Sequence, residues 1–324
     1  MAETTYLEAI RQAMFEEMER DLSVFLIGED VGLYGGAFKT SAGLIEKFGP
    51  ERVVDTPISE MAIVGAASGA ALMGMRPIAE MQFIDFITCA YDMLVNFTAT
   101  NRYLYGRSCP MVVRGPAGGG VHGGPFHSSN PEAMFLNRPG LKIVYPGTAY
   151  DAKGLLKAAI RDDDPVLYIE HKYLYRRVKE DLPSEDYVVP IGKANIRRRG
   201  KDITIITWGA MLYVADEAAA ELEKDGVSVE ILDLRSILPF DEDAILESVA
   251  KTNRVIILHE APLTGGAGAE FAARIAEKAF DYLDAPIRRV ASLDVPTPYS
   301  PPLEEAYLPN SRKVVAAARE LLAY

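Results

Sequence analysis

RVVDTPISEMAIVGAASGAALM, the stretch Arg52–Met73, decides how the fold begins. It opens with a short apolar run, Val53–Val54, that is typical of a strand, and Ser59 follows at the position of a helix N-cap. From Met61 to Met73 there is no charge, and small residues are spread over every face. This pattern predicts a helix that is buried all round. The helix is too short for a membrane span, which needs roughly 20 residues.

Glu60 lies in the first turn of that helix and is its one ionisable side chain. A carboxylate at this place can simply complement the positive end of the helix dipole. It can also be a carboxyl group with a raised pKa that forms a hydrogen bond to a ligand nitrogen. The residues alone leave both interpretations open.

Strand and helix signals alternate along the whole chain, which indicates an α/β fold with doubly wound, mainly parallel sheets. Within the first half, apolar spacing predicts one long helix over Gln82–Tyr105. A charged, proline-containing stretch interrupts the alternation at Tyr173–Gly200. We therefore expect a first domain over residues 1–185, a linker over 186–200 and a second α/β domain over 201–324.

Composition restricts the function classes. The chain has 324 residues and a net charge of −12, which argues against nucleic acid and anionic membranes as partners. Two cysteines are too few for a disulfide framework and favour a reducing compartment. The N-terminal segment is an acidic amphipathic helix with a Thr5/Glu8 capping box, unlike a signal or transit peptide. We expect a cytoplasmic protein.

A glycine-rich loop after a strand, GGGVHGGPFHSSNPEAMF, contains His122 and His127. Open α/β sheets bind ligands at the carboxyl ends of their strands, and an imidazole there can act as acid or base near neutral pH. The alternative is that both histidines only form hydrogen bonds within the loop. Two histidines in one such loop favour a site.

Four segments in order, DTPISEMAIVGAASGAA, AEMQFIDF, HSSNPEAMF and HEAPLTGGAGAE, resemble the β subunit of thiamin-diphosphate-dependent 2-oxo acid dehydrogenases (decarboxylating). The likeness covers essentially the whole chain and is closest to the branched-chain (2-oxoisovalerate) type. It implies a pyrimidine-binding domain followed by a transketolase C-terminal-like domain. The alternatives are a pyruvate or acetoin dehydrogenase β subunit, a split transketolase-like synthase, or a non-catalytic α/β scaffold subunit.

The resemblance also implies roles for single residues. Glu60 matches the glutamate that forms a hydrogen bond to N1′ of the cofactor's aminopyrimidine. Ile58, Gln82 and Phe86 match positions that line the pyrimidine pocket, although many relatives have Tyr where this chain has Phe86. His127 matches the active-site histidine that serves proton transfer during acyl transfer to a lipoyl group.

His122 is a further candidate for substrate or lipoyl contact. Family members also hold a structural monovalent cation, K⁺, whose nearest equivalents here are Ala159, Asp162 and Asp164.

An absence is equally informative. Enzymes of this class anchor the cofactor diphosphate through Mg²⁺ and a G-D-G motif, and no G-D-G occurs in this sequence. The resemblance thus implies that an α subunit holds Mg²⁺ in an α2β2 heterotetramer, and that a dihydrolipoyl acyltransferase core is a further partner. The proline-rich segment Val295–Pro302 is either an exposed strap near the docking surface or an ordinary loop.

Overall fold

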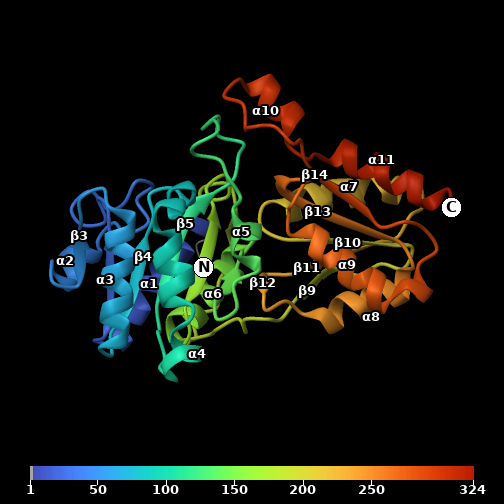
Figure 1. Ribbon diagram of the computed structural model, residues 1–324. Coiled ribbons are helices and arrows are strands. Elements are labelled where there is room, and N and C mark those ends of the chain that lie inside the picture. The colour runs from blue at the N-terminus through green and yellow to red at the C-terminus, as the bar shows by residue number, and fades with distance from the viewer. Residues whose placement is uncertain (1–2) are drawn as a thin grey trace. The chain divides into compact units, whose positions relative to one another are not determined.

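The structure is a computed structural model that describes residues 3–324 (Figure 1). The chain forms two compact units. Unit 1 contains the residues up to Ala117 together with Met134–Ile191, and unit 2 contains Gly118–Ala133 together with Gly192–Tyr324. The loop that carries both candidate histidines therefore belongs to unit 2, although it follows a strand of unit 1.

Unit 1 is built around a parallel sheet with the strand order β6-β7-β5-β4-β2-β3. Its strands are β2 (Val24–Gly28), β3 (Val53–Asp55), β4 (Arg76–Glu80), β5 (Val112–Ala117), β6 (Lys142–Val144) and β7 (Val166–His171). Its helices are α1 (Tyr6–Arg20), α2 (Leu44–Phe48), α3 (Glu60–Leu72), α4 (Asn101–Tyr105) and α6 (Ala149–Arg161), and α5 (Glu132–Leu136) crosses the boundary of the unit. Two short strands, β1 (Thr4–Thr5) and β8 (Lys179–Glu180), form an antiparallel pair. The mainly parallel, doubly wound architecture is confirmed.

The capping box predicted at the start of α1 is present. The Glu8 amide donates to the Thr5 hydroxyl at 3.2 Å, and the Thr5 amide donates to the Glu8 carboxylate at 3.0 Å. These two reciprocal bonds satisfy amides that a helix start leaves without partners.

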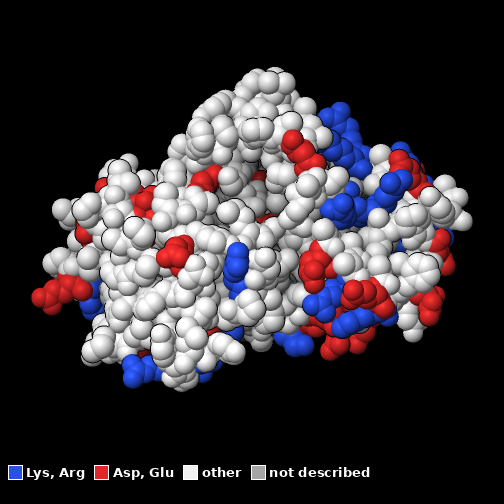
Figure 2. All heavy atoms as spheres, in the orientation of Figure 1, with Lys and Arg blue, Asp and Glu red and all other residues white. Residues whose placement is uncertain are grey.

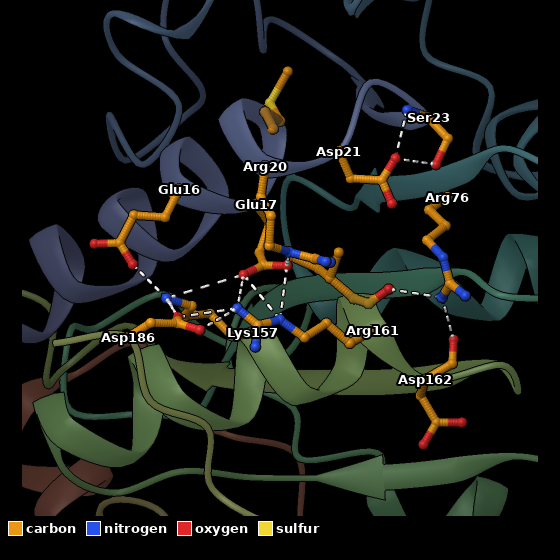
Figure 3. A network of polar contacts seen from close by, with 12 residues as sticks. Glu16, Glu17, Arg20, Asp21, Ser23, Arg76, Lys157, Arg161, Asp162 and Asp186 are labelled. Atoms are coloured by element: carbon orange, nitrogen blue, oxygen red, sulfur yellow. Dashed lines mark hydrogen bonds and ion pairs between the residues drawn. The ribbon is translucent and has the colours of Figure 1, made fainter.

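A network of ion pairs attaches α1 to α6 (Figure 3). Lys157 on α6 is almost fully buried, and its Nζ lies 2.5 Å from Oε2 of Glu16 and also pairs with Asp186. One turn further along α6, Arg161 donates to the buried carboxylate of Glu17 at 2.6 Å. Every buried charge in this contact therefore has an opposite charge beside it, as burial requires.

The helix α3 differs from the prediction that it is buried all round. Its buried residues, which pack toward β4 and the turn after it, are Ile63, Val64, Ala67, Ser68 and Ala71. On the other side Met61 is 57% exposed, and Ala62, Ala66 and Gly69 are exposed as well. Only one side of this apolar helix is therefore buried in the chain's own core. The Ser59 side chain also makes no capping hydrogen bond.

The predicted long helix over Gln82–Tyr105 is wrong. The segment divides into η1 (Ile84–Ala90, 3₁₀), η2 (Met93–Thr98, π) and α4. Thr98 accounts for the π turn: its hydroxyl donates to the Met93 carbonyl five residues back at 2.8 Å and lies 2.5 Å from the Ser68 hydroxyl of α3. A polar side chain inserted among the turns thus widens the helix locally.

Unit 2 has a second sheet, with the strand order β14-β13-β10-β11-β9, in which only β9 is antiparallel to its neighbour. The strands within unit 2 are β9 (Asn195–Arg198), β10 (Ile203–Thr207), β11 (Val229–Asp233), β12 (Ser236–Leu238), β13 (Val255–Pro262) and β14 (Arg288–Ser292), of which β12 is not part of this sheet. Its helices are α7 (Met211–Lys224), α8 (Glu242–Thr252), α9 (Gly268–Lys278), η3 (Phe280–Tyr282), α10 (Pro301–Tyr307) and α11 (Ser311–Leu322). Among residues 3–324, no helix is long and apolar enough to cross a membrane.

Candidate active site

Polar side chains gather where three neighbouring strands of unit 1 end. Glu29 and Asp30 directly follow β2, Asp55 ends β3, and Gln82 lies just after β4. These strands are parallel neighbours, so their carboxyl ends share one edge of the sheet. This edge is where open α/β sheets bind ligands.

Glu60 is the first residue of α3, and its charge acts on a second carboxyl group, Glu29. Glu29 is 5% exposed, and its burial, followed by the charge of Glu60, raises its pKa above the ordinary value. A backbone hydrogen bond from Ser59 offsets part of this shift. Two carboxyl groups are therefore held close together at the start of α3, and Glu60 is the more accessible of the two.

Gln82 belongs to the same edge. Its Nε2 donates to Oδ2 of Asp30 at 3.0 Å, so its side chain is fixed by the residue that follows Glu29. Asp30 has φ = +56°, an uncommon backbone conformation for a residue other than glycine. The hydrogen bond from Gln82 thus reaches a residue whose backbone conformation is itself unusual.

Apolar side chains flank these polar groups. Ile58 is 82% exposed just before α3, and Phe86 on η1 is half-buried, with its ring 6.2 Å from the ring of Phe83. The donor set thus combines an accessible carboxyl group with exposed aliphatic and half-buried aromatic surface. This combination fits the aminopyrimidine of thiamin diphosphate, a flat heterocycle whose ring nitrogen can share a proton with a carboxyl group.

The two candidate histidines lie in unit 2. His127 is half-buried, and its amide hydrogen-bonds to the Gly124 carbonyl at 3.4 Å. His122 is exposed, and its Nδ1 lies 2.6 Å from Oε2 of Glu304 on α10. Glu304 is buried and was not indicated by the sequence.

The base of the histidine loop is anchored at the end of β13. Oε1 of Glu260 accepts from the Gly119 amide at 2.6 Å and from Nδ2 of Asn130 at 3.1 Å. Beside it, the His259 ring stacks on Trp208 at a centroid distance of 5.5 Å, and burial lowers the pKa of His259 to about 4. His259 is therefore neutral at physiological pH and serves packing rather than acid–base chemistry.

Glu132, the first residue of α5, directly follows the same loop. It has no solvent exposure, and burial, the largest cause, raises its pKa to about 7. A carboxyl group with such a pKa changes its charge in the physiological range.

In the expected monovalent cation site, Asp162 and Asp164 form ion pairs with side chains of the protein. Nζ of Lys142 lies 2.7 Å from both carboxylate oxygens of Asp162 and 3.7 Å from Oδ2 of Asp164. Arg102 also pairs with Asp164, and Arg76 takes the Asp162 carbonyl at 2.8 Å. Side-chain cations of the protein thus contact several oxygens of this loop, and the K⁺ site near Ala159, Asp162 and Asp164 stays a prediction. Within the described part of the chain, no cluster of three or more His, Cys, Asp or Glu could hold a metal ion.

Two residues of the site, Glu29 and Glu304, were not predicted from the sequence. Glu29 had a usable signal, because it directly follows a buried strand and precedes a glycine-rich loop. Glu304 had none, because it lies 182 residues after His122 in a proline-rich segment.

Comparison with known proteins agrees with both units. Residues 2–178 match the transketolase pyrimidine binding domain, and residues 192–314 match the transketolase C-terminal domain. A solved split-gene transketolase, described as an inactive β4 tetramer, has a TM-score of 0.81 at 25% identity and covers 99% of each chain. The fold and the site thus define a transketolase-type α/β protein.

Full-length relatives give the family. The 2-oxoisovalerate dehydrogenase subunit β of Bacillus subtilis is 53% identical over 99% of each chain. The pyruvate dehydrogenase E1 component subunit β of Staphylococcus aureus is 44% identical over the whole of both. The chain belongs to the β subunits of the thiamin-diphosphate-dependent 2-oxo acid dehydrogenases.

Proposed function

We propose that this chain, together with an α subunit, catalyses the oxidative decarboxylation of a branched-chain 2-oxo acid and transfers the acyl group to lipoyl. The higher identity to the 2-oxoisovalerate enzyme than to the pyruvate enzyme supports this substrate class. A pyruvate dehydrogenase β subunit is the second candidate, supported by its 44% identity.

The observation that carries the proposal is the pair of carboxyl groups at the start of α3. When bound, thiamin diphosphate supplies the electron sink for decarboxylation of a 2-oxo acid. In our proposal Glu60 forms a hydrogen bond to N1′ of the aminopyrimidine, and Glu29, whose pKa is raised by burial and by the charge of Glu60, supports the same site. Ile58, Gln82 and Phe86 line the pyrimidine pocket in this proposal, and Nε2 of Gln82 also donates to Asp30.

The two histidines of the loop serve the acyl transfer in this proposal. His127 moves a proton during transfer to the lipoyl group, and His122 contacts the incoming lipoyl or substrate. An imidazole suits both roles because its unperturbed pKa lies near neutrality. Acyl transfer to the lipoyl group needs an acid–base residue, and the loop with His122 and His127 offers two.

An α subunit is the partner that the exposed side of α3 favours. Over the face of unit 1 that carries α3 and α4 in Figure 1, Figure 2 shows few charged side chains. Met61 is exposed there, as are Tyr103 and Leu104 on α4, at 92% and 57%. Uncharged, apolar surface of this kind marks a protein interface. We infer that the α subunit covers part of it in an α2β2 assembly and supplies the Mg²⁺ site.

The dihydrolipoyl acyltransferase core is the second partner in this proposal, and the cytoplasm is the proposed compartment. The segment Val295–Pro302 leads into α10, which begins at Pro301, and Val295 and Tyr299 are about half exposed. Its exposure supports a place near the docking surface. The division into a first domain over residues 1–185, a linker over 186–200 and a second domain over 201–324 stays a prediction.

A substrate panel on the reconstituted αβ enzyme tests the proposal. With thiamin diphosphate, Mg²⁺ and an artificial electron acceptor, we expect kcat/KM for 2-oxoisovalerate and its branched homologues to exceed that for pyruvate at least tenfold. A preference for pyruvate would favour the second candidate. No turnover of any 2-oxo acid, with no cofactor binding, would favour a scaffold subunit.

A further inference from the structure

A buried carboxylate on α10 holds the glycine-rich loop of His122. Glu304 is 1% exposed, and it comes from the segment beside the loop in Figure 1. Its Oε1 accepts from the Gly120 amide at 2.9 Å, and its Oε2 accepts from the His122 amide at 3.2 Å. The same Oε2 lies 2.6 Å from Nδ1 of the His122 ring. One side chain thus fixes both the backbone and the imidazole of His122.

The loop is shaped to admit this carboxylate. A Cβ at Gly119 would lie 3.2 Å from Oε1 of Glu304, which is tighter than ordinary contact. A Cβ at Gly124 would lie 2.1 Å from the ring of Tyr299, in the segment just before α10. His122 itself has φ = +60°, a conformation that a residue other than glycine keeps only when its surroundings enforce it. The contacts to Glu304 provide that enforcement.

The short distance between Nδ1 and Oε2 indicates which ring nitrogen of His122 carries the proton. A carboxylate only accepts, so the proton between Nδ1 and Oε2 belongs to Nδ1, and Nε2 is the ring nitrogen that does not face Glu304. The His122 side chain is 51% exposed, whereas that of Glu304 is 2% exposed. The imidazole is therefore held at its inner nitrogen, while its remaining surface is open to solvent.

We propose that Glu304 is a positioning residue that fixes His122 as a proton donor to the lipoyl sulfur during reductive acylation. The inference rests on the proposed function. In that reaction the S–S bond of the dithiolane breaks, one sulfur forms a bond to the acyl carbon, and the other leaves with the electron pair. In the imidazolium form of His122, Nε2 gives this sulfur its proton, which leaves the neutral ring with its proton on Nδ1, and Nε2 then regains a proton from water. The electrons come from the C–C bond that decarboxylation cleaves.

A purely structural role for Glu304 would need only its two bonds to backbone amides. The third contact, to Nδ1, adds nothing to the loop backbone but orients the ring. A carboxylate–imidazole pair of this kind is how proteins fix the tautomer and direction of a working histidine. The two roles therefore differ in what they predict for the ring.

The tautomer of His122 gives a test that needs no activity. The chain has only four histidines, so ¹⁵N-histidine labelling of the full chain gives four ring systems to assign, with His122→Gln identifying the signal. We expect neutral His122 to carry its proton on Nδ1 and to shift toward the mixed-tautomer average in Glu304→Gln. A wild-type ring that carries its proton on Nε2 would overturn the inference, even if Glu304→Gln failed to fold.

Kinetics of the assembled enzyme give the second test. We expect Glu304→Gln to lower kcat for reductive acylation of a lipoyl domain at least tenfold, with KM for the lipoyl domain changed less than twofold. Glu305→Gln is the matched control, because Glu305 is the next residue, its side chain is 72% exposed and its ion pair is with Arg312 rather than with the loop. We expect it to keep wild-type kcat.

A double-mutant cycle separates positioning from loop support. If Glu304 acts through His122, Glu304→Gln should lower kcat less than twofold when added to His122→Gln. Independent, multiplicative losses would contradict the inference. A wild-type enzyme without activity on any 2-oxo acid would refute the proposed function instead, and the tautomer measurement would still decide the role of Glu304.

Discussion

Glu29, at the carboxyl end of β2, lies within electrostatic reach of Glu60, the first residue of α3, and burial together with the charge of Glu60 raises the pKa of Glu29. The negative charge of Glu60 thus disfavours ionisation of Glu29. Both residues lie at the sheet edge where β2, β3 and β4 end, which is where open α/β sheets bind ligands. A carboxyl group at this edge can form a hydrogen bond to a ring nitrogen of a ligand.

Glu132 makes the stability of unit 2 depend on pH. Burial raises its pKa from 4.5 to about 7, so its favourable contribution is complete below about 4.5 and is lost as pH rises through about 7. Glu132→Gln removes this dependence. We expect the free energy of unfolding of the wild type to fall relative to this variant, by on the order of 2 kcal/mol between pH 5 and pH 7.

Urea unfolding of both proteins across this pH range, followed by the fluorescence of Trp208, measures the difference. Glu247→Gln on the exposed side of α8 is the control; it keeps Glu132, so its free energy of unfolding should fall with pH as that of the wild type does. Parallel curves for the wild type and Glu132→Gln would mean that Glu132 keeps an ordinary pKa.

Lys157 should be essential for the attachment of α1 to α6. Lys157→Met removes the cation that Glu16 and Asp186 share. It also removes a positive charge 4.0 Å from Oε1 of the buried Glu17. Breaking a buried ion pair from one side costs about 3 kcal/mol, and because Lys153 and Arg161 remain beside Glu16 and Asp186, we expect a loss of about 2 kcal/mol here.

Hydrogen exchange of α1 amides under native conditions reports this loss locally, without assuming two-state unfolding of a two-unit chain. Lys224→Met is the control, since its exposed pair with Glu221 is worth at most about 1 kcal/mol. Equal protection in both variants would show that packing alone holds α1.

The exposed side of α3 should be an assembly surface. Ala66→Glu places a charge in the middle of this apolar side and, by our proposal, weakens binding to the α subunit at least tenfold. Ala316→Glu, at an exposed position of α11, is the matched control. Sedimentation velocity of mixtures with the α subunit distinguishes the two; unchanged assembly of Ala66→Glu would place the interface elsewhere.

The isolated chain should bind thiamin diphosphate weakly, because its sequence contains no G-D-G motif, the motif through which relatives anchor Mg²⁺ and the diphosphate. Calorimetric titrations of the chain alone and of the αβ mixture test this. Tight, magnesium-dependent binding by the chain alone would contradict a site shared between subunits.

Most of the fold could be predicted because local patterns determine it. The helices over Met211–Lys224 and Ser311–Leu322 begin and end as their apolar periodicity predicts. Gln82–Tyr105 could not be predicted, because the Thr98 hydroxyl changes the helix type through a contact with Ser68, far away in the sequence. Periodicity describes one segment and contains no information about such contacts.

The site was predictable only where chemistry is local. Glu60 could be recognised from its place before a charge-free helix, and the segments of the family resemblance extended this to Gln82 and Phe86. The exposed side of α3 shows the opposite case, because an apolar sequence does not distinguish burial in its own core from burial under a partner. Glu304 reaches His122 only through tertiary structure.

The central claim is that Glu60 shares a proton with the cofactor's aminopyrimidine. The most direct measurement is the rate of hydrogen–deuterium exchange at the thiazolium C2 of thiamin diphosphate in the assembled enzyme, compared between wild type and Glu60→Gln. An amide keeps the volume of the carboxyl group but cannot share a proton in the same way, so the exchange rate should fall at least a hundredfold while thermal stability is kept. An unchanged rate would contradict the claim and leave Glu60 as a residue that only complements the dipole of α3.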